Sequence, residues 1–295
     1  SIIMSERIKV LKTYKIFIDG KFPRTESGRY YQLKSKDIPY ANVCLSSKKD
    51  LRNAVVAARK AFLPWAEKTA YNRSQILYRI AEMLESRKTQ FIDELTIQGF
   101  SKKDASKELD QSIDRIIYFA GWADKINQVF GAVNPVASSH YNFTLFEPMG
   151  VVGVLSSDES PLLGLVSSII PVIVSGNSCV VIASEKYPLS SISFAEVISN
   201  SDVPSGVINI LTGTKKELAT PISSHMDINA LGLFSQKIDK QLFINATENL
   251  KRISSFNDIQ IYSDDFDSPY IIKKFMDSKT TWHPVEVDFT KTNNY

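Results

Sequence analysis

The strongest hydrophobic pattern of the chain lies in residues 147–188. A mostly apolar run at 151–155 is followed by a polar turn at 156–160, a fully apolar segment at 162–174 and a second β-branched run at 180–182. Continuous apolar strands on either side of a buried helix are typical of a parallel sheet that is covered on both faces. The pattern therefore predicts strand, loop, helix and strand in this order, and it favours a nucleotide-binding type of fold.

Upstream of this stretch the polar and apolar positions follow helical spacing. Residues 14–22 first alternate around an Asp19-Gly20 turn, which predicts a hairpin. Apolar positions then recur at helical spacing in three segments, each of which has one polar side. The segments lie at 51–65, at 76–84 behind a predicted cap at Asn72, and at about 105–130. They predict a helical layer that covers another part of the fold.

Downstream, strand and helix patterns alternate. Strands are predicted at 207–211, 228–234 and 251–255, and helices at 189–198 behind a cap at Ser190, at 217–223 and at 237–250. Repeated β–α units of this length predict an α/β fold with a doubly wound sheet and a ligand crevice at the carboxyl ends of the strands. Gly150 and Gly153 stand before or inside the first strand rather than after it, so the usual dinucleotide fingerprint G-x-G-x-x-G is absent.

Between the helical layer and the sheet, residues 131–146 have an extended pattern. Tyr141, Phe143 and Leu145 alternate with polar or aromatic neighbours, after a break at Pro135. A ribbon of this kind is often an arm that pairs with another subunit through its exposed edge. An ordinary edge hairpin would produce the same pattern, and both interpretations remain open.

Length and composition exclude several classes of protein. A chain of 295 residues with 43% hydrophobic content can bury a large core, which excludes disorder as the main state. The net charge of +3 is small and no basic stripe is interleaved with aromatic residues, so nucleic-acid binding is not expected. The apolar segment at 162–174 is too short to span a bilayer, and the N-terminus lacks a signal pattern. Cys44 and Cys179 lie far apart, which argues against a disulfide framework and favours a cytoplasmic location.

Potential metal ligands occur without the spacing of a metal site. The acidic cluster of Asp264, Asp265 and Asp267 is more typical of a solvated turn than of a cation-binding loop. The three histidines are isolated from one another along the chain: His140, His225 and His283. We therefore expect no metal site.

Five motifs carry a resemblance to a known family. They are EPMGVVGV followed by PL, SGNSCVVIASEKYPLS, PSGVINILTG, HMDINALGL and NLKRI. In this order and at this spacing they resemble the cofactor half of the aldehyde dehydrogenase superfamily, whose nucleotide fold lacks the glycine fingerprint. The resemblance covers roughly residues 14–253. It implies an NAD-binding-like domain made of residues 1–130 and 147–262, and an oligomerisation β-ribbon made of residues 131–146 and 280–295.

The resemblance also implies where the catalytic residues of the family would lie. Members use a Cys nucleophile, a Glu general base and an Asn that stabilises the oxyanion. In this chain Glu159 stands at the position of that Asn, and Phe256 stands at or beside that of the base. Neither Cys44 nor Cys179 lies where the nucleophile falls, and no Cys follows Cys179. We therefore expect no catalytic residues, and a catalytic domain that is missing rather than mutated.

The cofactor contacts implied by the family are altered as well. The V-x-K-P-S-E motif appears as VIASE, which keeps Glu185 but has Ala183 in place of the Lys-Pro pair. The turn that approaches the pyrophosphate appears as LFSQ, so Ser235 and Gln236 replace a Gly-Ser pair and crowd the phosphate. The other positions that would contact the cofactor are Ser156, Ser157 and Gly213. We expect either no NAD binding or weak NAD binding.

The last segment, TTWHPVEVDFTK, alternates and predicts a strand that carries Trp282, Val285, Val287 and Phe289. Full-length members of the superfamily end in a similar strand, which pairs with the ribbon and builds the subunit interface. The chain thus resembles the second, cysteine-less and non-catalytic module of the two-module (family 16 type) aldehyde dehydrogenases.

Three interpretations of function remain open. The first is a pseudoenzyme that serves oligomerisation and scaffolding, either as a homo-oligomer, with a dimer expected, or together with a catalytic aldehyde dehydrogenase chain. The second is an NAD(P)-dependent aldehyde dehydrogenase subunit whose nucleophile comes from another chain, or an NAD-binding sensor. The third is a piece of a longer enzyme, against which the interface-like terminal strand argues.

Overall fold

The computed structural model describes residues 10–234 and 240–285. At its centre is a sheet of five parallel strands in the order β10-β9-β6-β7-β8. The strands are β6 (Val151–Leu155), β7 (Ser178–Ile182), β8 (Ile208–Leu211), β9 (Ala230–Leu233) and β10 (Arg252–Ser255). Every residue of β6, β7, β8 and β9 is buried, as the continuous apolar runs predict for strands covered on both faces. The α/β class and the doubly wound sheet are confirmed.

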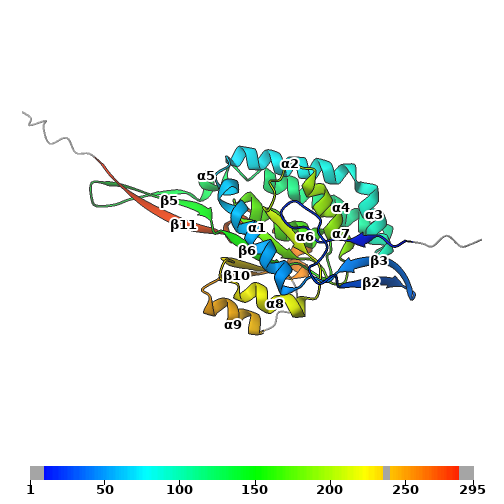
Figure 1. The fold of residues 1–295 in the computed structure, drawn as a ribbon. Helices are drawn as coiled ribbons and strands as arrows, with labels where there is room; N and C mark the ends of the chain where they lie inside the picture. The colour runs from blue at the N-terminus through cyan, green and yellow to red at the C-terminus, as the bar shows by residue number, and fades with distance from the viewer. Residues whose placement is uncertain (1–9, 235–239, 286–295) are drawn as a thin grey trace, which may run out of the picture.

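Helices cover both faces of this sheet (Figure 1). The first layer holds α2 (Ala70–Ser86), α4 (Lys102–Ala120), α6 (Leu163–Val174) and α7 (Leu189–Ser199), and the second holds α1 (Lys48–Ala66), α8 (Lys215–Ser224) and α9 (Lys240–Glu248). Residues 237–239 of the helix predicted at 237–250 lie outside the described residues. Alternate residues of β6 enter different cores: Val152 and Val154 face the first layer, whereas Val151 and Leu155 face the second. The sheet therefore separates two hydrophobic cores.

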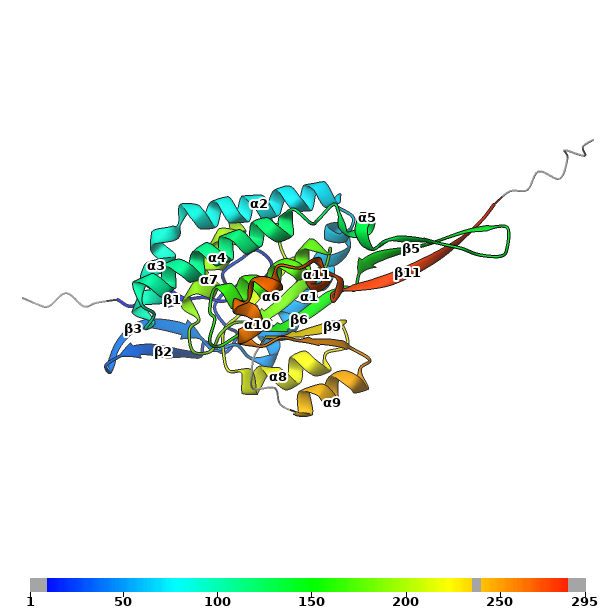
Figure 2. The ribbon, with the colours of Figure 1, turned by 180° about the vertical axis from the view of Figure 1, so that it is seen from behind.

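A second sheet forms an arm that projects from the body (Figures 1 and 2). Its strands are β4 (Ala132–Asn134), β5 (His140–Pro148) and β11 (Met276–Pro284), antiparallel in the order β11-β5-β4. Strand β11 pairs with β5 along its whole length, with Trp282 opposite Asn142. The predicted terminal strand and its pairing with the ribbon are thus confirmed, although the strand starts earlier than predicted. Val287 and Phe289, also predicted on it, lie outside the described residues.

Residues 256–275 form a short connection from β10 to this arm. They contain α10 (Asp258–Tyr262), the 3-10 helix η1 (Asp264–Phe266) and α11 (Pro269–Lys273), and α10 and α11 both contact α6 (Figure 2). Arg115 of α4 anchors the connection, because its Nε lies 2.8 Å from Oδ1 of Asp267 and its guanidinium also donates to the carbonyls of Ile261 and Ser263. The connection is therefore packed onto the first helical layer.

A third sheet lies near the N-terminus and is not predicted by the sequence pattern. It has the order β1-β3-β2, with β1 (Thr13–Tyr14), β2 (Tyr30–Ser35) and β3 (Ile38–Cys44). The Asp19-Gly20 turn forms, but it connects only an isolated antiparallel bridge between Ile18 and Lys21 and not a pair of strands. The longer hairpin is β2–β3, whose turn holds Lys36 and Asp37 at positive φ. Since neither residue is glycine, this turn gives no hairpin signal in the sequence.

Several predicted helix boundaries are wrong. Thr69 rather than Asn72 caps α2, because Thr69 Oγ1 accepts a hydrogen bond from the Asn72 N–H at 3.1 Å. Ser190 lies inside α7 and is not its cap. The segment predicted at 105–130 divides into α4 and α5 (Ile126–Phe130), and a separate helix, α3 (Lys88–Ile97), precedes it. Residues able to cap lie within a few positions of each start, and tertiary packing decides between them.

Candidate functional site

The predicted cofactor contacts lie at one edge of the parallel sheet. Ser156 and Ser157 directly follow β6, Glu185 follows β7, and Gly213 follows β8. The carboxyl ends of neighbouring parallel strands meet at the same edge, so the structure brings these four residues to the place where a ligand crevice is expected. The two other predicted contacts lie outside the described residues: Ser235 and Gln236.

The two serines after β6 are fully buried. Ser157 Oγ donates a hydrogen bond to the carboxylate of Asp258 in α10. It also accepts hydrogen bonds from the N–H groups of Glu159 (3.1 Å) and Ser160 (3.0 Å). Ser156 Oγ has no hydrogen-bond partner within the described part of the chain. Ser157 therefore serves the fold itself, because it fixes the turn before α6 and ties that turn to the connection.

A lysine that the sequence pattern did not indicate crosses this edge. Lys215 is the first residue of α8, and its Nζ lies 2.9 Å from Oδ2 of Asp158, in the turn after β6. Nζ also donates to the carbonyl oxygen of Ser156. The lysine side chain is 14% exposed, so burial lowers its pKa, while the carboxylate of Asp158 opposes this shift. An ion pair is thus held partly out of water across the ends of β6 and β8.

Glu185 closes a ring of contacts with this ion pair. Its backbone N–H donates to Asp158 Oδ1 at 3.0 Å, and its carboxylate Oε2 accepts from the backbone N–H of Lys215 at 3.2 Å. The hydroxyl of Tyr31 in β2 donates to the Glu185 carbonyl at 3.2 Å. The carboxylate that the resemblance assigns to a ribose is therefore engaged with the N-terminus of α8.

Gly213 supports a close approach within the chain. The loop before α1 lies against the end of β8, where Ser46 N–H donates to the carbonyl of Thr212 at 2.9 Å and Thr212 Oγ1 donates to the carbonyl of Cys44 at 2.7 Å. A Cβ at Gly213, whose φ is +152°, would lie 3.1 Å from the backbone nitrogen of Ser46. The absence of a side chain here is thus accounted for by packing between this loop and β8.

The two positions that the resemblance gives to catalysis carry no suitable group. The side chain of Glu159 is 59% exposed and its Oε2 lies 3.7 Å from Nζ of Lys186. Phe256 is buried and stacks on Phe234, with ring centroids 4.8 Å apart, and also contacts Phe266. An aromatic ring in an apolar cluster can neither take a proton nor stabilise an oxyanion.

Both thiols are buried and free. Burial raises the pKa of Cys179 to about 12 and also raises the pKa of Cys44. Because the thiolate is the nucleophilic form, both groups are chemically inert at neutral pH. Cys179 lies in the interior of β7 and Cys44 ends β3, as the sequence predicts for structural cysteines.

A buried carboxylate that sequence analysis missed occupies the N-terminus of α6. Glu108 of α4 accepts hydrogen bonds at Oε1 from the N–H groups of Leu162 (3.0 Å) and Leu163 (3.1 Å), and from Ser160 Oγ at 3.3 Å. Its Oε2 accepts from the hydroxyl of Tyr262 at 3.3 Å. Burial raises the pKa of Glu108 and these hydrogen bonds oppose the rise. The helix end that commonly attracts a ligand anion is therefore capped by the chain itself.

Replacement of Glu108 by alanine is expected to lower the free energy of unfolding by about 2–3 kcal/mol, because buried donors at the start of α6 lose their acceptor. Urea denaturation of Glu108→Ala beside Glu82→Ala, an exposed glutamate on α2, would measure the difference. Equal midpoints for the two variants would contradict this role of Glu108.

Within the described residues, no three His, Cys, Asp or Glu side chains are grouped as metal ligands. In the acidic cluster of residues 264–267, Asp267 pairs with Arg115 and the Asp265 N–H donates to Ser263 Oγ at 3.2 Å.

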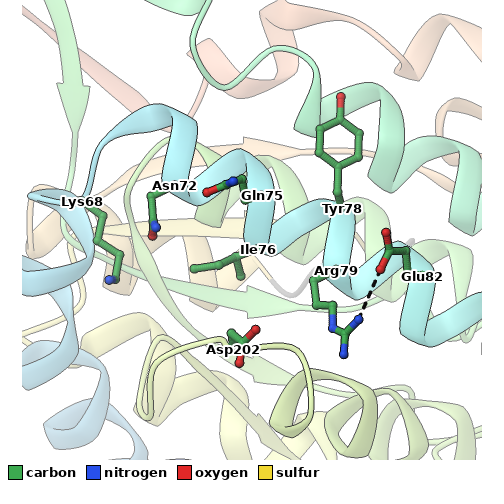
Figure 3. A pocket seen from close by; sticks show the side chains of 8 residues that line it. All are labelled: Lys68, Asn72, Gln75, Ile76, Tyr78, Arg79, Glu82 and Asp202. Atoms are coloured by element: carbon green, nitrogen blue, oxygen red, sulfur yellow. Dashed lines mark hydrogen bonds and ion pairs between the residues drawn. The ribbon is translucent and has the colours of Figure 1, made fainter.

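A pocket of about 580 Å³ lies along α2, away from the carboxyl edge of the sheet (Figure 3). It is lined by Lys68, Asn72, Gln75, Ile76, Tyr78, Arg79, Glu82 and Asp202. None of these residues belongs to the carboxyl edge of the sheet.

The parallel sheet without a glycine fingerprint, joined to a β-arm, defines the class of protein: an α/β nucleotide-binding type of domain with an attached ribbon. Residues 33–256 match the aldehyde dehydrogenase family, and the chain belongs to this family. The superfamily resemblance of its motifs is thereby confirmed.

Known proteins align with most of this chain but extend well beyond it. Cytosolic aldehyde dehydrogenase 1 of Elephantulus edwardii is 31% identical over 262 residues, which cover 84% of this chain and 50% of the relative. An aldehyde dehydrogenase of Aspergillus niger is 30% identical over 254 residues, again covering 84% and 50%. The solved NAD+ complex of an aldehyde dehydrogenase from Bacillus cereus superposes with a TM-score of 0.78 at 25% identity, over 83% of this chain and 51% of that one. The chain spans about half the length of these relatives.

Across residues 10–234 and 240–285, no helix combines the length and the apolar character needed to cross a bilayer. The most apolar helix, α6, is enclosed by the fold.

Proposed function

We propose that this chain is a non-catalytic aldehyde dehydrogenase-like protein that serves oligomerisation and scaffolding, on itself or on a catalytic aldehyde dehydrogenase. The observation that carries the proposal is the pairing of β11 with β5 immediately after a connection of residues 256–275. The paired arm is thus present although the connection leaves no room for a second α/β domain between β10 and β11. The same features support a placement with the cysteine-less second module of the two-module aldehyde dehydrogenases.

The chemistry of the sheet edge agrees with this proposal. A buried phenylalanine, Phe256, stands at or beside the position that the resemblance gives to the base, and both thiols are inert through burial. Glu159, at the oxyanion position, is an acceptor and would repel a developing negative charge. The described residues therefore offer no nucleophile, base or oxyanion donor for aldehyde oxidation.

The arm has an apolar face suited to association. Tyr141, Phe143 and Leu145 alternate along β5 and share one face, and Val133 of β4 lies opposite Phe143 on the same face. Val133, Tyr141 and Leu145 are 63%, 48% and 43% exposed. Strand β11 also forms the edge of this sheet. An exposed apolar row beside an open strand edge favours pairing with a second copy or a related chain.

The second candidate is an NAD-binding subunit or sensor, which Glu185 at the end of β7 and the NAD+ complex of the Bacillus cereus relative favour. The residues of this edge do not fit the dinucleotide well. Glu185 accepts from Lys215, the N-terminus of α6 holds Glu108, and Gly213 lies against Ser46. We therefore prefer the scaffolding role.

Light scattering after size exclusion at micromolar concentration tests the proposal. We expect a mass of at least two chains of 33.1 kDa. The variant Tyr141→Ser/Leu145→Ser is expected to dissociate at least tenfold more readily, while Ile38→Ser, which changes a residue 68% exposed on β3 away from the arm, keeps the original mass. A monomeric mass for the unchanged chain, both alone and mixed with a catalytic aldehyde dehydrogenase, would rule out the proposal.

A further inference from the structure

We infer that the Asp158–Lys215 ion pair closes the carboxyl-edge crevice from within, so that this chain excludes dinucleotides by an internal bridge. The inference deepens the proposed non-catalytic function, because it gives a physical reason why the family's cofactor would not bind.

The position of the pair carries the first step of the argument. Asp158 lies in the turn after β6 and Lys215 opens α8, which follows β8. In the sheet, β7 lies between β6 and β8. The ion pair of 2.9 Å therefore spans three strand ends, and the bonds of Glu185 to both partners fill the middle of the span.

The second step concerns what a dinucleotide would have to displace. Its ribose hydroxyls need acceptors and its pyrophosphate needs donors or cations. Here the Glu185 carboxylate accepts from Lys215 N–H, and the Lys215 ammonium is neutralised by Asp158. The side chains of the pair are only 14% and 32% exposed, so separating them leaves a partly desolvated charge.

The third step is independent of the ion pair. The N-termini of the helices that follow β6 and β8 are anion sites in principle. In this chain each one binds an internal carboxylate: Glu108 accepts from the first N–H groups of α6, and Glu185 accepts from the first N–H of α8. Carboxylates of the chain itself therefore occupy both helix N-termini at which a bound phosphate would be stabilised.

Calorimetric titration with ADP and with NAD+ tests the inference. For the unchanged chain we expect no saturation up to about 5 mM ligand. Asp158→Ala removes the competing carboxylate and leaves the Lys215 ammonium free for the pyrophosphate, so we expect saturable binding at least tenfold tighter than that of the unchanged chain. Glu82→Ala removes an exposed carboxylate on α2, away from this edge of the sheet, and serves as the control, which should behave like the unchanged chain.

A second variant keeps the test decisive if Asp158→Ala does not fold. Asp158→Asn keeps the shape of the side chain and an acceptor for the Glu185 N–H but removes the charge that neutralises Lys215, so we expect the same gain of at least tenfold. Sub-millimolar binding by the unchanged chain, or no gain by either folded variant, would overturn the inference. The oligomeric mass of each variant, measured in parallel, reports on the scaffolding role separately, because the ion pair and the arm share no residues.

Discussion

Replacement of Arg115 by alanine is expected to lower the free energy of unfolding by about 3–5 kcal/mol, since it removes a buried guanidinium that pairs with Asp267 and donates to three further groups. The Arg115 side chain is 4% exposed and lies in the first helical layer, between α6 and the connection of residues 256–275. The loss should therefore appear as unfolding of the whole chain at lower urea concentration, not as a local change at the surface.

The contacts of Arg115 explain the size of this effect. Its Nε lies 2.8 Å from Asp267 Oδ1, and Nη1 donates to Ser167 Oγ at 2.8 Å and to the carbonyl of Ile261 at 2.6 Å. The guanidinium also lies over the ring of Phe266, 4.7 Å from its centroid. Alanine would remove this donor from the Asp267 carboxylate and from the carbonyls of Ile261 and Ser263, and would leave a cavity.

Urea denaturation followed by circular dichroism would measure the change. Arg79→Ala is the matched control, because Arg79 is 50% exposed and pairs with Glu82 on the same helix, where the loss should stay below about 0.5 kcal/mol. A loss below about 1 kcal/mol for Arg115→Ala would show that the connection does not depend on this anchor.

The sequence predicted those parts of the fold that depend on continuous hydrophobic runs. Strand β6 and helix α6 were predicted almost residue by residue, and β7 was predicted from its third residue, because buried parallel strands leave few alternatives. The pairing of β11 with β5 rested on the family resemblance, since antiparallel partners so far apart in the chain share no local signal. The β2–β3 hairpin was missed because its turn lacks glycine.

The buried charges of the candidate site were missed for a different reason. Glu108, Ser112 and Arg115 lie on the buried side of α4 together with Leu109 and Ile116, so they interrupt an apolar stripe at helical spacing. That interruption was a usable signal, but the partners of these charges lie about 50 or more positions away. The Asp158–Lys215 pair could have been anticipated from the rule that neighbouring strand ends meet, although its geometry could not.

Replacement of Phe256 by glutamate, which introduces the family's general-base residue type at or beside the position that the resemblance gives to the base, is expected to give no aldehyde oxidation and to cost about 4–5 kcal/mol of unfolding free energy. Phe256 is 4% exposed and lies within reach of Phe234, Phe266 and Phe275, at centroid distances of 4.8, 5.4 and 6.5 Å. These rings offer the introduced carboxyl no hydrogen-bond donor, and the Nζ of Lys274, 5.2 Å from the centroid of the Phe256 ring, would offset only part of the cost of burying a charge there.

The comparison of Phe256→Glu with Phe256→Leu separates charge burial from loss of ring packing. The leucine variant should lose about 1–2 kcal/mol, because it keeps an apolar side chain with a small cavity. NADH formation from an aldehyde, followed at 340 nm, should be absent in both variants and in the unchanged chain. A stable Phe256→Glu variant that oxidises aldehydes would show that the catalytic machinery is one substitution from completion, and would contradict the scaffolding role.

The expected instability of Phe256→Glu also distinguishes two explanations of the phenylalanine at this position: loss of the base from an otherwise polar site, or replacement of the whole site by apolar packing. If the base alone had been lost, a carboxyl at this position would meet polar groups prepared for it, and stability would change little. Here Phe256, which the family resemblance places at or beside the base position, belongs to the aromatic core between the connection of residues 256–275 and the sheet. Stability of this fold therefore favours an apolar side chain at a place where a base would have to carry a charge, and one side chain cannot meet both demands.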